Sequence, residues 1–471
     1  MLFNSYNYIF AFLPLVLLSF FHAKANLRKW ILILASVIFY ALFSWIDLTI
    51  LILSILINFF LAQRLRGNKT ATFIGIVFNL VLLFYFKLQL NQSELGDSVF
   101  TGVILPLGIS FYTFQQIAFQ VDCYKGEVKQ KNIFDYALFV GFFPQLISGP
   151  IVLYRDIIPQ FQSSWLGQNK FSNIKEGFFL IAIGLFKKIV LADSFAKIFN
   201  ELNRVDELGA VYAWALILAY SFQIYFDFSG YTDIAIGSAK SLNIELPVNF
   251  NSPYKSRNIQ EFWSRWHITL YKFLKNYLYT PLIENTKLPK VLIMACVFIL
   301  SGLWHGIGLN FLFWSVGHIF LMVVWRLFRF SGIKLPLLIS QVLTFFSVSI
   351  LWQYFANSDI DRVFKIFESL LVFNSSQFQI LTQQYEYFLA NLGIGFGLNL
   401  EALVSFVSQL MVPNFFMPWL LVGFVIVFRF RNSAIIAQSA RGKLFMTLVL
   451  LTITVFFWEL QDTERFIYFE F

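Results

Sequence analysis

Charged side chains are scarce in this chain. Lys, Arg, Asp and Glu together make up 13% of its 471 residues, whereas a soluble domain carries about 25%. Hydrophobic residues make up 58%, and the mean hydropathy is +0.69. This balance excludes an ordinary soluble domain and predicts an all-α integral membrane protein.

Cysteine is almost absent as well, since Cys123 and Cys296 are the only two. Two thiols provide neither a disulfide framework nor a four-ligand metal site, so we expect no metal. The net charge is +9, but the basic residues lie between hydrophobic runs. That arrangement is typical of cytoplasmic loops in membrane proteins and not of a nucleic-acid-binding surface.

Long apolar runs alternate with short polar loops, which predicts successive membrane-spanning helices. The runs lie near residues 8–21, 30–45, 46–63, 71–90, 100–122, 172–200, 209–226, 291–303, 309–325, 336–355, 395–412, 415–428 and 444–458. The loops after the first, third and fifth runs are basic, and the loop after the fourth carries acidic residues only. Because basic loops face the cytoplasm, we expect both termini on the opposite, periplasmic side of the inner membrane.

Residues 227–290 differ from the rest of the chain. Within 250–290 there are seven Lys or Arg against two Glu, which is too polar for regular spans in lipid. The segment is either a cytoplasmic amphipathic helix or irregular backbone that other helices shield. Its basic side chains either contact lipid headgroups or form an opening for an anionic substrate such as a coenzyme A thioester.

His305 is one of only four histidines and lies in an apolar stretch, Val291–Trp325, that holds no charged residue. The stretch is too long for one crossing and short for two, and Gly306 and Gly308 favour a break beside His305. An ionisable side chain at membrane depth indicates a functional site, and we expect His305 to act as a general base or acid. Metal binding is disfavoured because no Asp or Glu lies near in sequence. Ser301, four residues earlier, makes a Ser–His nucleophile geometrically possible, but a serine within a helix usually bonds the carbonyl four residues before it, and we favour that role.

Four other ionisable residues attract attention. His267 lies among aromatic residues and on its own pattern is more often structural than catalytic, and His318 is expected to pack or to hydrogen bond. Asp227 and Asp233 need partners if they are buried, so we expect them to form ion pairs.

Several stretches together resemble the membrane-bound O-acyltransferase family. They are residues 105–128, FPQLISGP at 143–150, residues 225–270, which end in FWSRWHITL, and SGLWHGIGLNFLFWSVGHIF at 301–320. The resemblance covers most of the chain. Within the family it is similar to the bacterial branch that modifies polysaccharides, including alginate and peptidoglycan O-acetylation and teichoic-acid D-alanylation.

The resemblance implies a fold of about eleven transmembrane helices, with re-entrant or amphipathic segments, around a central pore. It implies that His305 is the essential histidine deep in that pore and that His267 is a second catalytic position on the cytoplasmic side. Residues 1–459 would form the membrane domain. Residues 460–471 would be an extracytoplasmic tail, similar to a C-terminal motif whose tyrosine, here Tyr468, is proposed to accept the acyl group; the alternative is an aromatic membrane anchor.

From these elements we expect an enzyme that uses acetyl-CoA as a donor substrate and holds no bound cofactor. Lys255, Arg257 and Arg265 are the candidates for the donor opening, and a periplasmic partner protein would pass the acetyl group to a polymer, with peptidoglycan favoured. The alternatives are acetylation of alginate or another exopolysaccharide, D-alanyl transfer from a carrier protein, and a transporter or flippase in which histidines relay protons. The last expects acidic partners in the spans, and 291–325 has none.

Overall fold

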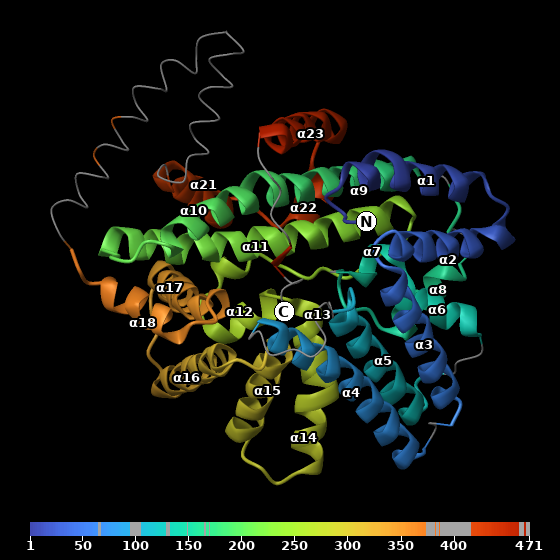
Figure 1. The fold of residues 1–471 in the computed structure, drawn as a ribbon, viewed down its shortest axis with the longest axis horizontal. Helices are drawn as coiled ribbons and strands as arrows, with labels where there is room; N and C mark the ends of the chain where they lie inside the picture. Colours follow the sequence, from blue (N-terminus) through green and yellow to red (C-terminus); the bar gives the residue numbers. More distant parts are fainter. Residues whose placement is uncertain are drawn as a thin grey trace.

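The computed structural model describes residues 1–64, 67–94, 105–128, 132–147, 149–163, 166–168, 170–373, 382, 386, 416–460 and 466–467. Every regular element within these ranges is a helix, as the composition predicts. The longest helix, α11 (Ala210–Ser241), runs through the middle of the molecule, and the other helices lie on its sides (Figure 1).

The N-terminal helices follow the predicted runs closely. They are η1 (Asn7–Phe12), α1 (Leu13–His22), α2 (Ala25–Ala41), α3 (Trp45–Ala62), α4 (Lys69–Glu94) and α5 (Ile109–Lys125). Helices α3, α4 and α5 lie side by side, as Figure 1 shows. Nearly every side chain of α5 is buried, including Gln115, Gln116 and Gln120. This helix therefore belongs to the interior of the protein, which explains why it is more polar than α3.

The glycine- and proline-interrupted segment after α5 forms the short helices α6 (Ile133–Gly141), α7 (Phe143–Leu146) and α8 (Tyr154–Phe161). The predicted run 172–200 is a single path of α9 (Phe171–Leu185), the π-helical turn η2 (Phe186–Ala192) and α10 (Asp193–Asn203). A π-helical turn rotates the side chains that follow it. Here η2 carries Lys187 and Lys188, which both pair with aspartates of α11.

The sequence pattern was wrong about where the span after residue 209 ends. We expected a mixed polar segment from residue 227, but α11 continues to Ser241 and contains both Asp227 and Asp233. The helix can be this polar because it lies inside the protein, where its charged side chains have partners. Only the chain from Leu242 onward leaves the helix for an irregular path.

Glycines bring α9 and α11 together. A Cβ added at Gly237 would lie 2.5 Å from the carbonyl oxygen of Gly177, and one added at Gly230 would lie 2.8 Å from that of Gly184. In both helices the two glycines are seven residues apart, on one face. Small residues let helix backbones pack closely inside a membrane, so these four positions set the distance between α9 and α11.

The irregular path leads into the polar segment of the chain, which forms four short helices beneath α11. They are η3 (Pro253–Lys255), α12 (Ile259–Arg265), α13 (Ile268–Leu274) with the π-helical turn η4 (Lys275–Tyr279), and α14 (Thr280–Asn285). The remaining helices are α15 (Lys290–His305), α16 (Leu309–Ser331), α17 (Leu337–Ala356), α18 (Ile360–Ser369), α21 (Phe416–Arg429), α22 (Ser433–Ser439) and α23 (Lys443–Leu460).

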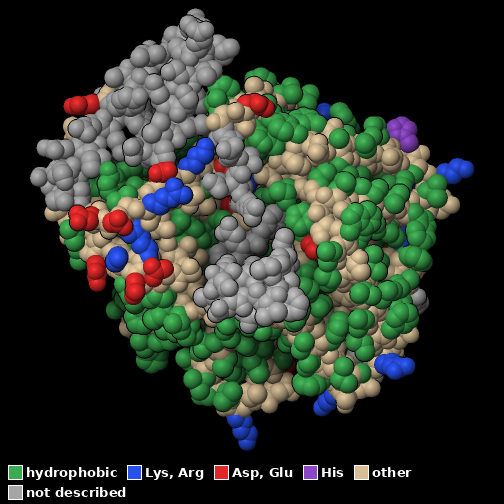
Figure 2. Space-filling view, in the orientation of Figure 1, with side chains coloured by type: hydrophobic (Ala, Val, Ile, Leu, Met, Phe, Trp, Pro, Cys, Tyr) green, Lys and Arg blue, Asp and Glu red, His purple; other side chains and the backbone are tan. Residues whose placement is uncertain are grey.

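Six of the described helices are long and apolar enough to cross a membrane, and a bent pair formed by α21 and α22 brings the number to seven. The expected count of about eleven is not confirmed by these residues, and the predicted span 395–412 lies outside them. Hydrophobic side chains cover most of the face in Figure 2, and charged ones gather on the side where α18 lies. The chain is thus a multi-pass membrane protein.

The close contact of α9 and α11 predicts that Gly237→Ala destabilises the protein. The new methyl group must displace backbone, not a flexible side chain, and overpacking of this kind costs about 1–3 kcal/mol. The midpoint of thermal unfolding in detergent should fall. Gly141→Ala is the matched control, because its Cβ would meet nothing within 4 Å. Equal midpoints for the two variants would contradict the proposed packing.

Candidate active site

His305 is the last residue of α15, and the predicted break follows it directly. Gly306 is extended, and α16 begins three residues later at Leu309. The 16 residues of α15 rise about 24 Å at about 1.5 Å per residue, less than the roughly 30 Å hydrocarbon core of a bilayer. A helix of this length is too short to cross that core by itself, and His305 stands at its C-terminal end.

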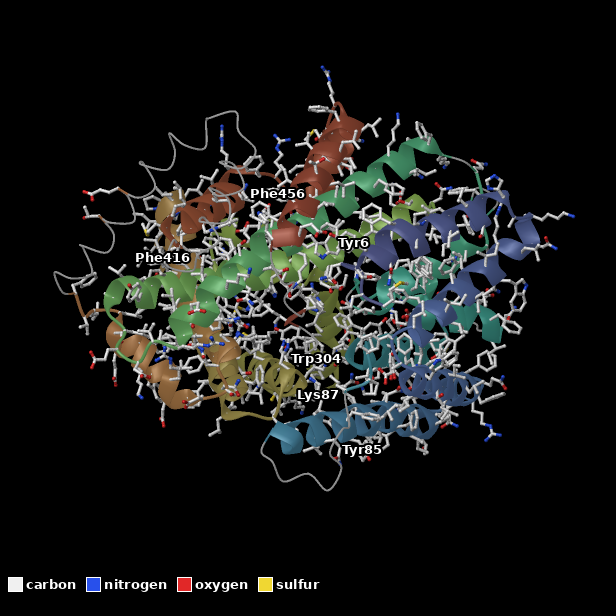
Figure 3. All side chains as sticks on the ribbon, turned by 45° about the horizontal axis from the view of Figure 1, so that its top comes forward. Tyr6, Tyr85, Lys87, Trp304, Phe416 and Phe456 are labelled. Atoms are coloured by element: carbon white, nitrogen blue, oxygen red, sulfur yellow. The ribbon has the colours of Figure 1, made fainter. Side chains whose placement is uncertain are left out.

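A lysine from another helix caps this end of α15. Lys87, from α4, is 5% exposed, and its ammonium group donates to the backbone carbonyls of Trp304 and of His305, the latter at 3.1 Å. Figure 3 shows Lys87 and Trp304 side by side. The last carbonyls of a helix have no partners within it and carry partial negative charge. Lys87 satisfies two of them and fixes the backbone of His305.

Aromatic rings surround the His305 side chain, which is 6% exposed. Its ring centroid lies 4.7 Å from that of Phe355, 5.6 Å from Trp314 and 6.2 Å from Phe311. Packed rings hold the imidazole in one orientation and keep bulk water away from it. This arrangement suits proton transfer within a shielded site.

His267 lies between α12 and α13 with a positive φ of 44°. Its Nδ1 is 3.3 Å from the side-chain oxygen of Asn249, which also accepts hydrogen bonds from the backbone and hydroxyl of Thr269. Left-handed backbone at a non-glycine residue is uncommon and clusters at functional sites. An Nδ1–H that donates to Asn249 leaves Nε2 of His267 as the proton acceptor.

The structure brings the two predicted histidines together. The ring of Trp304 is near both, with its centroid 4.4 Å from that of His305 and 6.5 Å from that of His267. His267 lines a cavity of about 310 Å³ together with Ser301, Lys275 and Arg326, whereas His305 is not among the lining residues. Ser301 faces this cavity and makes no hydrogen bond to His305 among the described residues. The site thus consists of two imidazoles and, beside His267, a mostly apolar cavity that carries the cationic side chains of Lys275 and Arg326.

Phe466 and Ile467, near the C-terminus, are buried close to His267. Phe466 is 1% exposed, and its ring stacks on Tyr231 at a centroid distance of 4.1 Å. The same ring lies 6.0 Å from Phe228, which in turn lies 4.8 Å from His267. Tyr468, the predicted acyl acceptor, lies outside the described residues.

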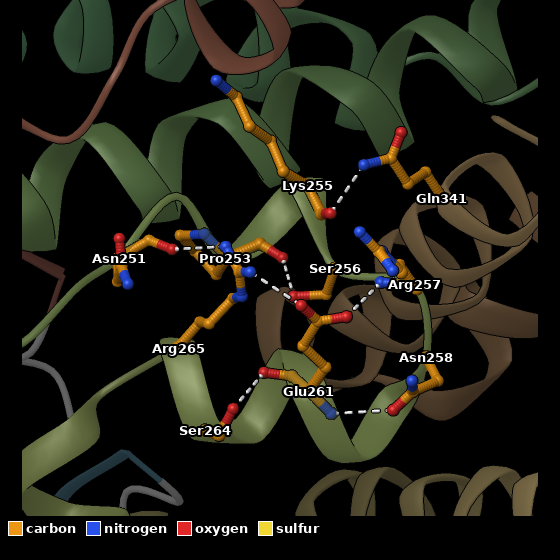
Figure 4. A network of polar contacts seen from close by, with 10 residues as sticks. All are labelled: Asn251, Pro253, Lys255, Ser256, Arg257, Asn258, Glu261, Ser264, Arg265 and Gln341. Atoms are coloured by element: carbon orange, nitrogen blue, oxygen red, sulfur yellow. Dashed lines mark hydrogen bonds and ion pairs between the residues drawn. The ribbon is translucent and has the colours of Figure 1, made fainter. Parts of the chain in front are cut away.

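The three predicted donor-opening residues lie together, as Figure 4 shows, but most of their polar groups already have partners. The guanidinium of Arg265 pairs with Glu261 at 2.7 Å, and the backbone N–H of Arg257 donates to the same carboxylate. Lys255 donates to the backbone carbonyl of Phe430. None of the three lines the cavity beside His267; Arg257 lines a separate cavity of about 430 Å³.

A cluster of positive charge surrounds Lys255. Partial burial and the nearby Arg265, Arg429 and Arg431 lower the pKa of its ammonium group. Arg429 is the last residue of α21, and Arg431 follows in the loop after it. Positive charge at the edge of a protein attracts anionic molecules, and the assignment of Lys255, Arg257 and Arg265 to a donor opening stays a prediction.

The remaining ionisable residues fit simpler roles. His318 packs between Trp263 and Trp314, and neither of its ring nitrogens has a hydrogen-bond partner among the described residues. The predicted ion pairs of the two aspartates are confirmed: Asp233 pairs with Lys187 and Asp227 with Lys188. Within the same part of the chain, no group of three His, Cys, Asp or Glu side chains could hold a metal ion.

The site thus contains two buried histidines inside a helical membrane protein. Comparison with known proteins identifies the class of enzyme. The profile of the membrane-bound O-acyltransferase family matches residues 36–356, and the chain belongs to this family of enzymes. It is 34% identical to a peptidoglycan O-acetyltransferase of Helicobacter pylori, over 100% of this chain and 98% of that protein. It is 32% identical to a probable alginate O-acetylase of Azotobacter vinelandii, over 79% and 78% of the two chains. A teichoic acid D-alanyltransferase of Bacillus subtilis is 28% identical over 58% of this chain.

Two residues of the site were missed by the sequence reasoning. Lys87 is a charged residue inside the apolar run 71–90, and a lysine at membrane depth is itself a signal of function. The sequence gives no indication that Asn249 belongs to the site, because asparagine is common in polar segments. Its importance comes from a contact with a residue 18 positions away in the sequence.

The contact between Lys87 and the end of α15 predicts that Lys87→Met impairs catalysis. Methionine fills similar space but donates no hydrogen bond, so two buried carbonyls beside His305 lose a charged donor. Bonds to charged groups contribute about 1.5–3 kcal/mol, so acetyl transfer should fall about tenfold or more. Lys69→Met, an exposed position on the same helix, serves as the control. Normal activity of Lys87→Met would show that the cap does not position His305.

Proposed function

We propose that this acyltransferase moves an acetyl group from acetyl-CoA on the cytoplasmic side of the inner membrane to its own C-terminal Tyr468. A periplasmic partner protein then transfers the acetyl group to a hydroxyl of peptidoglycan. The observation that carries the proposal is the burial of Phe466 and Ile467 on the side of the protein where His267 lies. Tyr468 is the next residue after this buried pair.

The chemistry requires one base and one nucleophile. A phenol has a pKa near 10 and is a weak nucleophile until a base removes its proton. The imidazole of His305 accepts that proton while the phenolic oxygen attacks the thioester carbonyl carbon. The C–S bond then breaks, the coenzyme A thiolate leaves, and the imidazolium returns a proton to it. The product is a phenyl ester, which the hydroxyl of the next acceptor can cleave because phenolate is a good leaving group.

The donor would approach from the polar segment. The positive cluster around Lys255 would attract the phosphates of coenzyme A, and the cavity lined by Lys275, Arg326 and His267 would hold the thioester arm. Binding of the thioester arm in this cavity is consistent with its mostly apolar walls and few polar groups, which are typical of small-molecule sites.

Peptidoglycan is favoured as the polymer. The similarity to the Helicobacter pylori peptidoglycan O-acetyltransferase extends over all of this chain, whereas that to the alginate O-acetylase covers about four fifths. Covering the whole length includes the C-terminal segment on which the proposed relay depends.

The first test is mass spectrometry of the C-terminal peptide after purified protein is incubated with acetyl-CoA. We expect one acetyl group on Tyr468 in the wild type. In His305→Ala the labelling rate should fall about 10²–10⁴-fold, which is the usual contribution of a general base.

The control is Tyr468→Phe, which removes only the phenolic oxygen and should abolish the label. An unlabelled wild-type peptide would mean that the donor differs, as for a D-alanyl carrier protein, or that the tail serves as an anchor. Undiminished labelling in His305→Ala would remove that residue from the mechanism.

The second test concerns the positive cluster. In the double variant Lys255→Gln and Arg431→Gln, the KM for acetyl-CoA should rise about threefold to tenfold, because two charges that attract the donor are gone. The kcat should change less than about twofold. Arg441→Gln, in the next loop, between α22 and α23, and outside the cluster around Lys255, is the control. A fall in kcat at unchanged KM would place these residues outside the donor opening.

A further inference from the structure

Three charged side chains with almost no exposure lie between η2, α10 and α11, and the proposed reaction uses none of them. The ammonium group of Lys188 is 2.7 Å from Oδ1 of Asp227 and 2.9 Å from Oδ1 of Asp193. All three side chains are at most 1% exposed. Charges buried to this degree persist only when they are paired and hydrogen bonded.

The C-terminal segment meets this cluster directly. The backbone N–H of Ile467 donates to Oδ2 of Asp227 at 2.8 Å, across 240 positions of the sequence. One turn further along α11, the ring of Phe466 stacks on Tyr231. The tail is therefore held by two contacts of different kinds, one polar and one aromatic, on the same helix.

The geometry of the Asp227 carboxylate explains why a backbone N–H suits this place. Lys188 approaches Asp227 through Oδ1, which leaves Oδ2 directed at the tail. A carboxylate binds a neutral N–H donor strongly in a buried site, and such a donor adds no further charge. The N–H group is common to nearly all residues, so the stacked ring of Phe466 provides the selectivity.

We propose that Asp227, supported by Lys188 and Asp193, forms with Tyr231 a docking site for the C-terminal segment of this same chain. Docking holds the segment so that the residue after Ile467 is presented to the histidine site. Asp227 is thus a positioning residue. The inference rests on the proposed function, because its purpose is to load Tyr468.

The test measures how well position 467 is protected. Ile467→Cys is placed in a protein in which Cys123 and Cys296, the two native cysteines, are replaced by alanine. The side chain at 467 is 7% exposed, and its backbone N–H is retained in the variant. A hydrophilic maleimide should therefore label the docked cysteine slowly in the purified, detergent-solubilised protein.

Substitutions at Asp227 should release the tail in a graded way. Asp227→Asn keeps an oxygen acceptor but loses the charge, and Asp227→Leu loses both. We expect labelling to be faster in the Asn variant and at least about tenfold faster in the Leu variant, because local opening becomes easier. Both leave Lys188 paired with Asp193. Asp233→Asn, on the same helix and paired with Lys187, is the matched control and should label at the original rate.

Substitutions at Phe466 test the docking site without changing the buried charges, so that misfolding of the interior is not the cause of any effect. Phe466→Ala leaves the buried cluster intact and should also expose position 467, whereas Phe466→Trp preserves a stacking ring and should keep it protected. Equal labelling rates in all of these proteins would overturn the docking site, and so would faster labelling in Asp233→Asn alone.

The outcomes separate this inference from the proposed function. Protection that depends on Asp227, with no acetyl group on Tyr468, would retain the docking site and overturn the relay. Acetylation of Tyr468 that is unaffected by Asp227→Leu and Phe466→Ala would retain the relay and overturn the docking site.

Discussion

The cap that Lys87 provides at the end of α15 is the contact on which the rest of the site depends. A helix that stops within a membrane leaves carbonyl groups that water cannot reach. The ammonium group from α4 satisfies the carbonyls of Trp304 and His305, and the backbone can then turn at Gly306 into α16. His305 is therefore held by its own helix end, and Trp304, fixed in the same way, contacts the rings of both His305 and His267.

The second constraint is the polarity of α11. This helix buries two aspartates, and it can do so because η2 turns Lys187 and Lys188 toward it and because glycines let α9 approach closely. The same helix provides Phe228 and Tyr231, whose rings both contact that of Phe466. A single buried helix thus connects the ion pairs, the C-terminal segment and the ring of His267.

The sequence predicted well those features that depend on local pattern. In the described part of the chain the apolar runs form helices, and the glycines after His305 mark a break, because both signals involve residues that are neighbours in the chain. The end of α11 was misjudged because the pattern cannot distinguish a polar segment in water from one that is shielded by other helices. The roles of Lys87 and Asn249 depend on contacts between distant parts of the sequence, which no periodicity carries. The roles expected for His305, His267 and the C-terminal tail came from the resemblance to a family and not from local sequence pattern.

The central claim is that the C-terminal segment carries the acetyl group during turnover. The most direct measurement is a pulse–chase experiment in membranes that contain the enzyme, its periplasmic partner and the polymer. A pulse of isotopically labelled acetyl-CoA is followed by unlabelled acetyl-CoA, and the acetyl content of the C-terminal peptide and of the polymer is followed in time. The account predicts that label appears on the tail first and leaves it as fast as the polymer gains it. Polymer labelling without prior labelling of the tail, or a tail label that persists through the chase, would contradict it.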